Sequence, residues 1–342
     1  MSYIASLDQG TSSTRCMIFD KSGAVIAIAQ KEHQQFTPQP GWVEHDAGEI
    51  WQNTQSVIQE AVTTAGKKAG LASIEISAIG ITNQRETIVA WNKQTGKPYG
   101  NAIVWQDRRT ADRCVELAEN LPLVRKQTGL VLDPYFSGTK IEWLLNNREV
   151  RQDDDLCIGT IDSWLIWNLT GSKSFVTDCT NASRTMLFDI SELCWSDQLT
   201  KMLGVQPKFL PEVRASSGDF GVTIQHGSVP AGISISGVAG DQHAALFGQA
   251  CFDTGSTKNT YGTGSFVLMN VGKNCPSPRD GMLTTIAWQL GNEKPVYALE
   301  GAIFVTGAAI QWLRDGLNII DNASEITALA QSVVDSSGVV VV

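Results

Sequence analysis

A short polar segment near the N-terminus has the composition of a phosphate-binding turn. It lies between two apolar runs and contains Asp8, Gly10, Thr11, Ser12, Ser13 and Arg15. Glycine lets a backbone approach a ligand closely, successive backbone N–H groups bind anions, and hydroxyl groups add donors. The planar guanidinium of Arg15 suits phosphate oxygens. An ordinary polar hairpin turn would explain the same residues, so the segment alone leaves both interpretations open.

Asp8 ends an apolar run, where an unpaired carboxylate would be costly. Its position therefore indicates a cation nearby, and a metal ion is one such cation. The motif G-x-x-x-x-G-K-[ST] does not occur, and no G-x-G-x-x-G follows a strand and opens a helix. The segment is therefore neither a P-loop nor a dinucleotide-binding turn.

A second segment repeats the pattern of turn glycines around a threonine. It reads Tyr-Gly-Thr-Gly over residues 261–264, with Thr263 between the glycines. Alone it is typical of a plain hairpin turn. Two such turns in one chain favour a paired phosphate clamp.

Asp241 lies where a buried-looking strand is expected to end and a helix to begin. It is a natural helix N-cap, a role worth about 1 kcal/mol. If a hydroxyl substrate and a phosphate lay beside it, the same carboxylate could accept the hydroxyl proton during phosphoryl transfer. The local sequence is compatible with either role.

Arg85 and Glu86 stand in an unbroken polar run after the apolar segment 76–82. They could form a surface ion pair of small energetic value, or offer a donor fork and an acceptor to a polyol. Trp105 and Tyr135 are aromatic residues of the kind that usually pack in a core, although such faces also pack against the carbon edges of polyols. The four histidines are too dispersed for a metal triad, and we interpret them as surface or structural residues.

The bulk composition excludes several classes of protein. A chain of 342 residues suits about two domains at roughly 150 residues each. Its net charge of −9 gives no general attraction to nucleic acid or anionic membranes. Seven scattered cysteines without a C-x-x-C pair favour reduced thiols over a disulfide frame or a zinc site. With no signal peptide and no apolar run of membrane length, we expect a cytoplasmic protein without membrane insertion.

Several elements must position these residues. Asp46, with Glu49 three places on, predicts a helix over residues 46–65. The remaining patterns predict an antiparallel meander over 3–8, 14–20 and 24–30, a strand over 76–82, a strand and turn over 87–97, a strand over 233–240, a helix over 241–250, a hairpin over 257–270 and a strand running into a helix over 296–316.

Taken together, these stretches resemble the glycerol kinases of the FGGY carbohydrate kinase family, within the superfamily of actin, hexokinase and the heat-shock chaperones. The ordered set is far more specific than any one motif. It covers the chain nearly end to end and includes LDQGTSSTR, PGWVEHD, GITNQRET, NAIVWQDRRT, DPYFSGTK, TDCTNASRTMLFDI, GVAGDQHAALFGQ, KNTYGTG and ALEGAIFVTGAAIQWLRD.

The resemblance implies an α/β, actin-like/ribonuclease H-like ATPase fold with two domains around a central cleft. Residues 1–245 would form the N-terminal domain, which binds substrate and phosphate. Residues 246–342 would begin the C-terminal nucleotide-binding domain. Because family members are longer than this chain, we expect that second domain to be incomplete here.

The resemblance also implies a reaction: ATP and glycerol give sn-glycerol 3-phosphate and ADP, with Mg²⁺. Asp241 would be the general base, and Asp8 would lie near the metal. Glycerol would be held by Arg85, Glu86, Trp105, Tyr135, Asp241, Gln242 and Phe266. The nucleotide would be bound by Thr11, Ser12, Ser13, Arg15, Thr263, Gly307 and Gln311.

Two alternatives to this function remain at the level of the sequence. One is another sugar kinase of the family, acting on xylulose, gluconate or ribulose. The other is a non-catalytic module that binds a polyol or nucleotide. The resemblance further implies a homo-oligomer, either a dimer or a tetramer.

Overall fold

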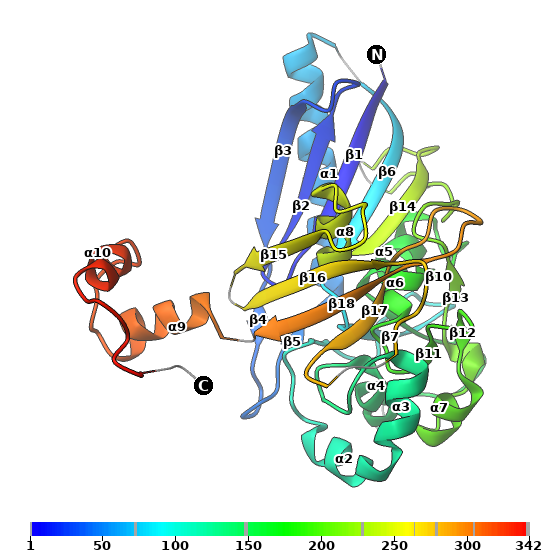
Figure 1. The fold of residues 1–342 in the computed structure, drawn as a ribbon. Coiled ribbons are helices and arrows are strands. Elements are labelled where there is room, and N and C mark those ends of the chain that lie inside the picture. Colours follow the sequence, from blue (N-terminus) through cyan, green and yellow to red (C-terminus); the bar gives the residue numbers. More distant parts are fainter. Residues whose placement is uncertain are drawn as a thin grey trace.

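The computed structural model describes residues 2–71, 74–146, 150–226, 229–262, 264–277, 280–303 and 305–339. Two large sheets dominate it, one mixed and one antiparallel, and a third group of strands and helices lies beside them (Figure 1). Thr263, a predicted nucleotide contact, lies outside the described residues.

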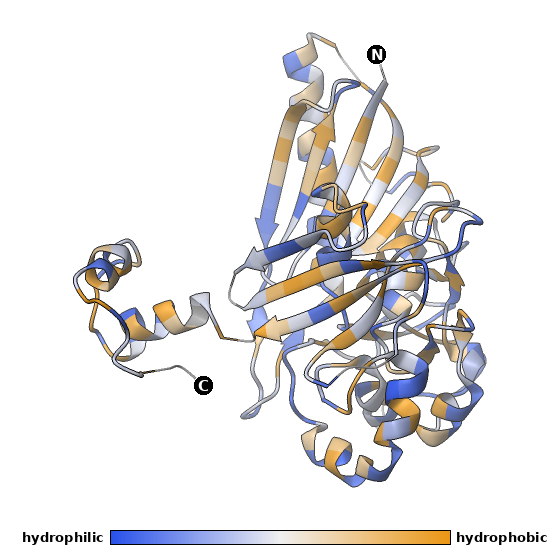
Figure 2. Ribbon diagram, in the orientation of Figure 1, coloured by the Kyte–Doolittle hydropathy of each residue, from blue (hydrophilic) through white to orange (hydrophobic). Residues whose placement is uncertain are grey.

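The first sheet is the predicted meander extended by two parallel strands. Its strand order is β14-β6-β1-β2-β3, in which β1 pairs antiparallel with β2 and parallel with β6. Its members are β1 (Ser2–Gln9), β2 (Ser13–Phe19), β3 (Val25–Glu32), β6 (Glu75–Asn83) and β14 (Ser234–Gly240). In Figure 2 the hydrophobic colour runs along much of β2, whereas the end of β3 is hydrophilic.

The two faces of this sheet have different environments because side chains alternate along a strand. Leu7 and Cys16 are opposite each other in the register and fully buried. Asp8 and Arg15, the next pair in the register, are only partly buried. The residues predicted to face a ligand are therefore on the other face from the apolar core.

Helix α1 (Ala47–Ala69) packs its apolar residues into the core of this sheet. The predicted cap is confirmed, since the carboxylate of Asp46 accepts hydrogen bonds from the backbone N–H groups of Gly48 and Glu49. The helix continues to Ala69, four residues beyond the predicted end, and stops at Gly70 in the left-handed conformation. A left-handed glycine is a common C-terminal stop.

The second sheet has the order β15-β16-β18-β17 and is antiparallel throughout. Its strands are β15 (Thr257–Tyr261), β16 (Ser265–Gly272), β17 (Leu283–Trp288) and β18 (Val296–Ile303). Helix α8 (Asp241–Gly248) connects β14 of the first sheet to this second sheet. The predicted hairpin over 257–270 corresponds to β15 and β16.

The segment between β6 and β14 builds a third layer of short elements, visible in the lower part of Figure 1. It contributes strands β7, β8 and β9 to a five-stranded sheet with β4 and β5, which precede β6 in the chain. The elements are β4 (Gln35–Phe36), β5 (Glu44–His45), β7 (Ile88–Asn92), β8 (Ala102–Ile103), α2 (Ala111–Glu116), η1 (Ala118–Asn120), α3 (Leu121–Thr128), α4 (Ser137–Asn146), β9 (Leu156–Thr160), α5 (Ile161–Leu169), β10 (Val176–Asp178), α6 (Cys179–Ala182), β11 (Phe188–Asp189), β12 (Cys194–Trp195), α7 (Asp197–Met202), η2 (Pro207–Phe209) and β13 (Glu212–Arg214).

The last described segment lies apart from both sheets in Figure 1. It contains α9 (Gly307–Gln311), η3 (Trp312–Gly316) and α10 (Glu325–Gln331). Most of its described side chains are exposed, including Trp312. Within the described ranges, no helix is long and apolar enough to cross a membrane.

Candidate active site

Three parallel strands of the first sheet end at the same edge, and each is followed by predicted site residues. Strand β1 leads into the Thr11 turn, β6 into Arg85 and Glu86, and β14 into Asp241. Because β1, β6 and β14 are neighbours in the sheet, these segments meet in space. Ligands in open α/β sheets commonly bind at the carboxyl ends of parallel strands.

A small cavity of about 170 Å³ lies at this edge. The predicted glycerol contacts all line it, together with one residue of the first hairpin and three positions of the second. The lining residues are Thr11, Arg85, Glu86, Trp105, Tyr135, Asp241, Gln242, Thr260, Gly262, Gly264 and Phe266. The structure therefore brings together the residues that the sequence singled out separately.

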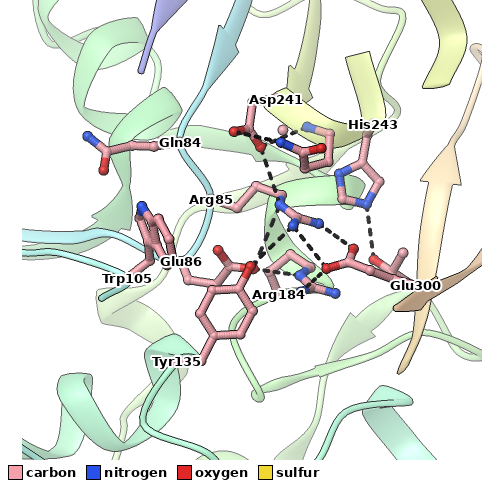
Figure 3. Close-up of polar contacts among 12 residues, drawn as sticks. Gln84, Arg85, Glu86, Trp105, Tyr135, Arg184, Asp241, His243 and Glu300 are labelled. Carbon is pink, nitrogen blue, oxygen red and sulfur yellow. Dashed lines mark hydrogen bonds and ion pairs between the residues drawn. The ribbon is translucent and has the colours of Figure 1, made fainter. Parts of the chain in front are cut away.

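Arg85 is the centre of a buried ion network (Figure 3). Its guanidinium forms a bidentate pair with Glu300, with Nη1–Oε2 and Nη2–Oε1 distances of 2.6 and 3.0 Å. Its Nε lies 3.3 Å from Oδ1 of Asp241, and Nη2 donates to the Tyr135 hydroxyl at 3.2 Å. Arg85 is thus an internal cation, and the surface ion pair considered from the sequence is wrong because its side chain is only 2% exposed.

Arg184 is a second buried cation in the same network. Its Nε donates to Glu86 at 2.6 Å and its Nη2 to Glu300 at 2.9 Å. Two arginines and two glutamates therefore alternate around the floor of the cavity. Burial would raise the pKa of Glu300, but the charges of Arg184 and Arg85 outweigh it and hold the pKa below its ordinary value.

Glu86 has an unusual backbone, with φ of +61°. This left-handed conformation is uncommon for a residue other than glycine. It is stabilised from outside the loop, since the Ser137 hydroxyl donates to the Glu86 carbonyl oxygen at 2.9 Å. Strain of this kind is often found at functional sites, where the surrounding structure maintains it.

Three aromatic side chains form the apolar wall of the cavity. The ring of Trp105 packs edge-on against Tyr135 and Phe266, at centroid distances of 5.7 and 6.2 Å. The indole N–H of Trp105 donates to the Thr11 hydroxyl at 2.9 Å. This bond joins the aromatic wall directly to the first glycine-rich hairpin.

Asp241 is the first residue of α8, and Gly240 occupies the cap position. The predicted N-cap role is therefore wrong, although the carboxylate still accepts the N–H of Gln242 at 2.7 Å. The Asp241 side chain is 37% exposed, the most accessible carboxylate in the network. It is thus the acceptor available to a ligand in the cavity.

The first hairpin places its polar groups on the ligand face of the first sheet. The N–H of Gly10 bonds to the carbonyl oxygen of Ser13, which closes the turn around Thr11 and Ser12. Ser13 and Arg15 both bond to Gln30 of β3. Burial and the negative charge of Asp241 raise the pKa of Asp8, whereas Arg15 lowers it. Asp8 is therefore close enough to Asp241 for the charge of that carboxylate to affect it.

The second hairpin approaches from the other sheet. The N–H of Gly307 donates to the carbonyl oxygen of Gly262 at 3.0 Å, which sets the start of α9 against the turn. Gln311 lies at the exposed end of α9 and does not line the cavity. Two described residues on this side were predicted to contact the nucleotide. Gly307 is hydrogen-bonded to the second hairpin, whereas Gln311 has no such bond to the described part of that hairpin.

Sequence reasoning gave no role at the site to the segment that connects these strand ends. Asn181 exchanges two hydrogen bonds with Asn83 at the end of β6, and the Thr180 hydroxyl accepts the N–H of Gly240 at the end of β14. Arg184, three residues after Asn181, belongs to the ion network. The unusual density of hydroxyl, amide and arginine side chains in TNASR was the available signal.

Of the two interpretations given for the histidines, surface or structural, His243 fits the structural one, since it is fully buried beside the network. Its Nε2 lies 3.1 Å from the Thr285 hydroxyl. Burial and the nearby charge of Arg85 hold its pKa well below the ordinary value, so it stays neutral. Across the described ranges, no cluster of three or more His, Cys, Asp or Glu could hold a metal ion by itself.

Comparison with known proteins identifies relatives along the whole chain. Residues 3–248 match the N-terminal domain model of the FGGY family of carbohydrate kinases, and residues 257–342 match the C-terminal domain model of that family. A glycerol kinase of Bacillus licheniformis is 52% identical over 99% of this chain and 69% of its own length. Glycerol kinase 2 of Thermotoga maritima is also 52% identical, over 99% of this chain and 68% of its own length.

Solved structures agree with these matches. The glycerol kinase of Plasmodium falciparum, determined with ADP, superimposes with a TM-score of 0.90 at 39% identity and covers 97% of this chain and 67% of its own. A gluconate kinase from Lactobacillus acidophilus superimposes with a TM-score of 0.83 over 97% of this chain and 66% of its own. At 21% identity, the second likeness concerns the fold alone.

Proposed function

The chain belongs to the FGGY family of carbohydrate kinases, and from this premise we propose that it phosphorylates glycerol with ATP to give sn-glycerol 3-phosphate and ADP. The predicted two-domain, actin-like fold is confirmed by the superposition on a glycerol kinase at a TM-score of 0.90. The 52% identity to curated glycerol kinases supports glycerol over another acceptor.

The observation that carries the proposal is the cavity at the strand ends. Its volume of about 170 Å³ is below the roughly 300–1,000 Å³ of sites for drug-sized ligands, which suits a three-carbon polyol. Arg85 offers donors, Asp241 offers an acceptor, and the aromatic wall around Trp105 suits a carbon backbone. Each hydroxyl group needs both a donor and an acceptor, and this cavity supplies them on adjacent residues.

Asp241 is proposed as the general base. Its accessible carboxylate would accept the proton of the terminal hydroxyl as the phosphoryl group moves to that oxygen. Arg85 holds this carboxylate through the contact of 3.3 Å and is itself fixed by Glu300. Such positioning matters because a displacement of about 1 Å can cost roughly a hundredfold in rate.

The phosphates of ATP are proposed to lie between the two hairpins. Thr11, Ser12, Ser13 and Arg15 would contact them from the first sheet, with Thr263, Gly307 and Gln311 on the opposite side. The partial exposure of Asp8 and Arg15, on the face of the sheet opposite its apolar core, supports this placement. The division of the chain into a first domain of residues 1–245 and a second of residues 246–342 would place one hairpin on each domain. This division stays a prediction.

The residues fit a magnesium ion held mainly by its substrate. Mg²⁺ is usually bound by one or two carboxylates together with phosphate oxygens. Asp8 provides such a carboxylate, and the effect of Asp241 on its pKa indicates excess negative charge there. When bound, the ion would offset charge on the phosphates. A cytoplasmic location and assembly into a dimer or tetramer likewise stay predictions.

A coupled assay of ADP release tests the function. We expect release that depends on glycerol and magnesium, with xylulose, ribulose and gluconate as much poorer acceptors. A sugar that is a better acceptor than glycerol would assign the chain to another branch of the family. No glycerol-dependent release would refute the proposal.

A further inference from the structure

Lys258 is a buried cation behind the wall of the substrate cavity. It lies on β15 and is only 4% exposed. Among the residues that the structure describes, no carboxylate lies within ion-pair distance of its Nζ. A buried charge without such a partner is costly, so a lysine at this position needs an explanation beyond packing.

The three donors of Lys258 are directed at three residues that line the cavity. Its Nζ donates to Oε1 of Gln242, to the Thr260 hydroxyl at 2.9 Å and to the carbonyl oxygen of Phe266 at 3.4 Å. Gln242, Thr260 and Phe266 all line the cavity that holds Arg85 and Asp241. One side chain therefore connects three parts of the cavity wall.

The contact with Gln242 fixes the direction of its amide group. A lysine has only donors, so it can bond only to the amide oxygen. The NH₂ group of Gln242 is thereby directed to the other side, where Nε2 lies 3.3 Å from Oδ2 of Asp241. Gln242 thus presents a donor, and Asp241 an acceptor, side by side at the cavity.

We propose that Lys258 is a positioning residue for the acceptor substrate, which it serves by holding the Gln242 amide as a hydrogen-bond donor. The inference rests on the proposed function and deepens it. A substrate hydroxyl between the two residues accepts an N–H from Gln242 and directs its own proton to Asp241. Lys258 touches neither the hydroxyl nor the phosphates, so its effect falls on recognition of the polyol.

Steady-state kinetics of Lys258→Met at pH 7 test the inference. Loss of one oriented hydrogen bond predicts a KM for glycerol raised about fivefold to tenfold. We expect the KM for ATP and the turnover number to change less than about threefold, because Lys258 faces the polyol side. The matched control is Lys273→Met, since Lys273 lies just after β16 and is paired with Glu293 at the surface. An unchanged KM for glycerol in Lys258→Met, or equal losses for both substrates, would overturn the inference.

A double-mutant cycle separates action through Gln242 from general loss of packing. If Lys258 acts through that amide, Lys258→Met should change the KM for glycerol little further when Gln242 is already replaced by alanine. Fully additive effects of the two substitutions on this KM would contradict the proposal. Gln242→Glu provides a second variant, in which the new carboxylate can pair with the buried Lys258 and so preserve the fold. It lacks the amide donor, so we expect it to bind glycerol as poorly as Gln242→Ala does; binding equal to wild type would contradict the proposal.

Calorimetric titration with glycerol makes the two proposals distinguishable, because binding needs no turnover. Wild-type protein that binds glycerol without phosphorylating it would refute the proposed function. Weaker binding by Lys258→Met would in that case still support the inference. Wild-type protein that does not bind glycerol would refute both.

Discussion

Arg85 and Glu300 form a bidentate ion pair although they are 215 positions apart in the sequence. Arg85 follows β6 of the first sheet, and Glu300 lies on β18 of the second. Both side chains are almost completely buried, at 2% and 0% exposure. The pair therefore joins the two main sheets directly beneath the substrate cavity.

Replacing the second arginine of this network should destabilise the protein strongly. Arg184→Met leaves Glu86 and Glu300 to share Arg85 in a buried site, and losing one partner of such a pair typically costs about 3–5 kcal/mol. Arg125→Met is the matched control, because Arg125 pairs with the exposed Asp280. For this variant we expect the free energy of unfolding to change by about 1 kcal/mol or less. Urea unfolding measures both. Equal stability of the two variants would contradict the proposed importance of the network.

Gly240→Ala should displace Arg85. A Cβ atom at this position would lie 2.7 Å from Cγ of Arg85 and 3.0 Å from Nδ1 of His243, closer than side chains pack. We expect glycerol phosphorylation to fall roughly a hundredfold in kcat/KM if Arg85 moves by about 1 Å. Gly248→Ala, at the other end of α8, meets no atom within 4 Å and should retain full activity. Normal kinetics of Gly240→Ala would show that the position of Arg85 is not critical.

Asp241→Asn tests the general base. The amide keeps the shape of the side chain and its place at the start of α8, but it cannot accept a proton. We expect turnover to fall by roughly a hundredfold to ten-thousandfold. Binding of glycerol and ATP, followed by calorimetry, should remain within a few fold. Turnover near that of the wild type would exclude the proposed role.

Asp162, a buried aspartate that does not line the cavity, should make stability depend on pH. Burial and the neighbouring charge of Asp178 raise the pKa of Asp162 from 3.8 to about 7. Between these two values the folded protein retains a proton that the unfolded chain loses, so the free energy of unfolding decreases as pH rises. Asp162→Asn removes this titration while the Thr160 and Thr177 hydroxyls remain as neighbours. Urea unfolding at pH 5, 6, 7 and 8 measures this effect. The free energy of unfolding should decrease less steeply with pH in the variant than in the wild type.

The meander, the capped helix and the strands β6 and β14 were predicted correctly from the sequence, because each rests on a local pattern. Periodicity identified the strands, and parallel strand ends bring Arg85 and Asp241 together. Glu300 and Lys258 were not found, because nothing local marks a charged residue on a strand as the contact of a residue far away in the sequence. For His243 the sequence left a surface and a structural role open, because its burial depends on contacts with the second sheet, such as that with Thr285. The catalytic and binding roles stay predictions.

The ion pair between Arg85 and Glu300 also limits how the molecule can open. Separating the two sheets at this point would leave buried charges without partners, at a cost of several kcal/mol. Substrate entry must therefore proceed with the pair intact. We therefore expect the outer parts of the two hairpins to move when a substrate enters, while Arg85 and Glu300 keep the floor of the cavity in place.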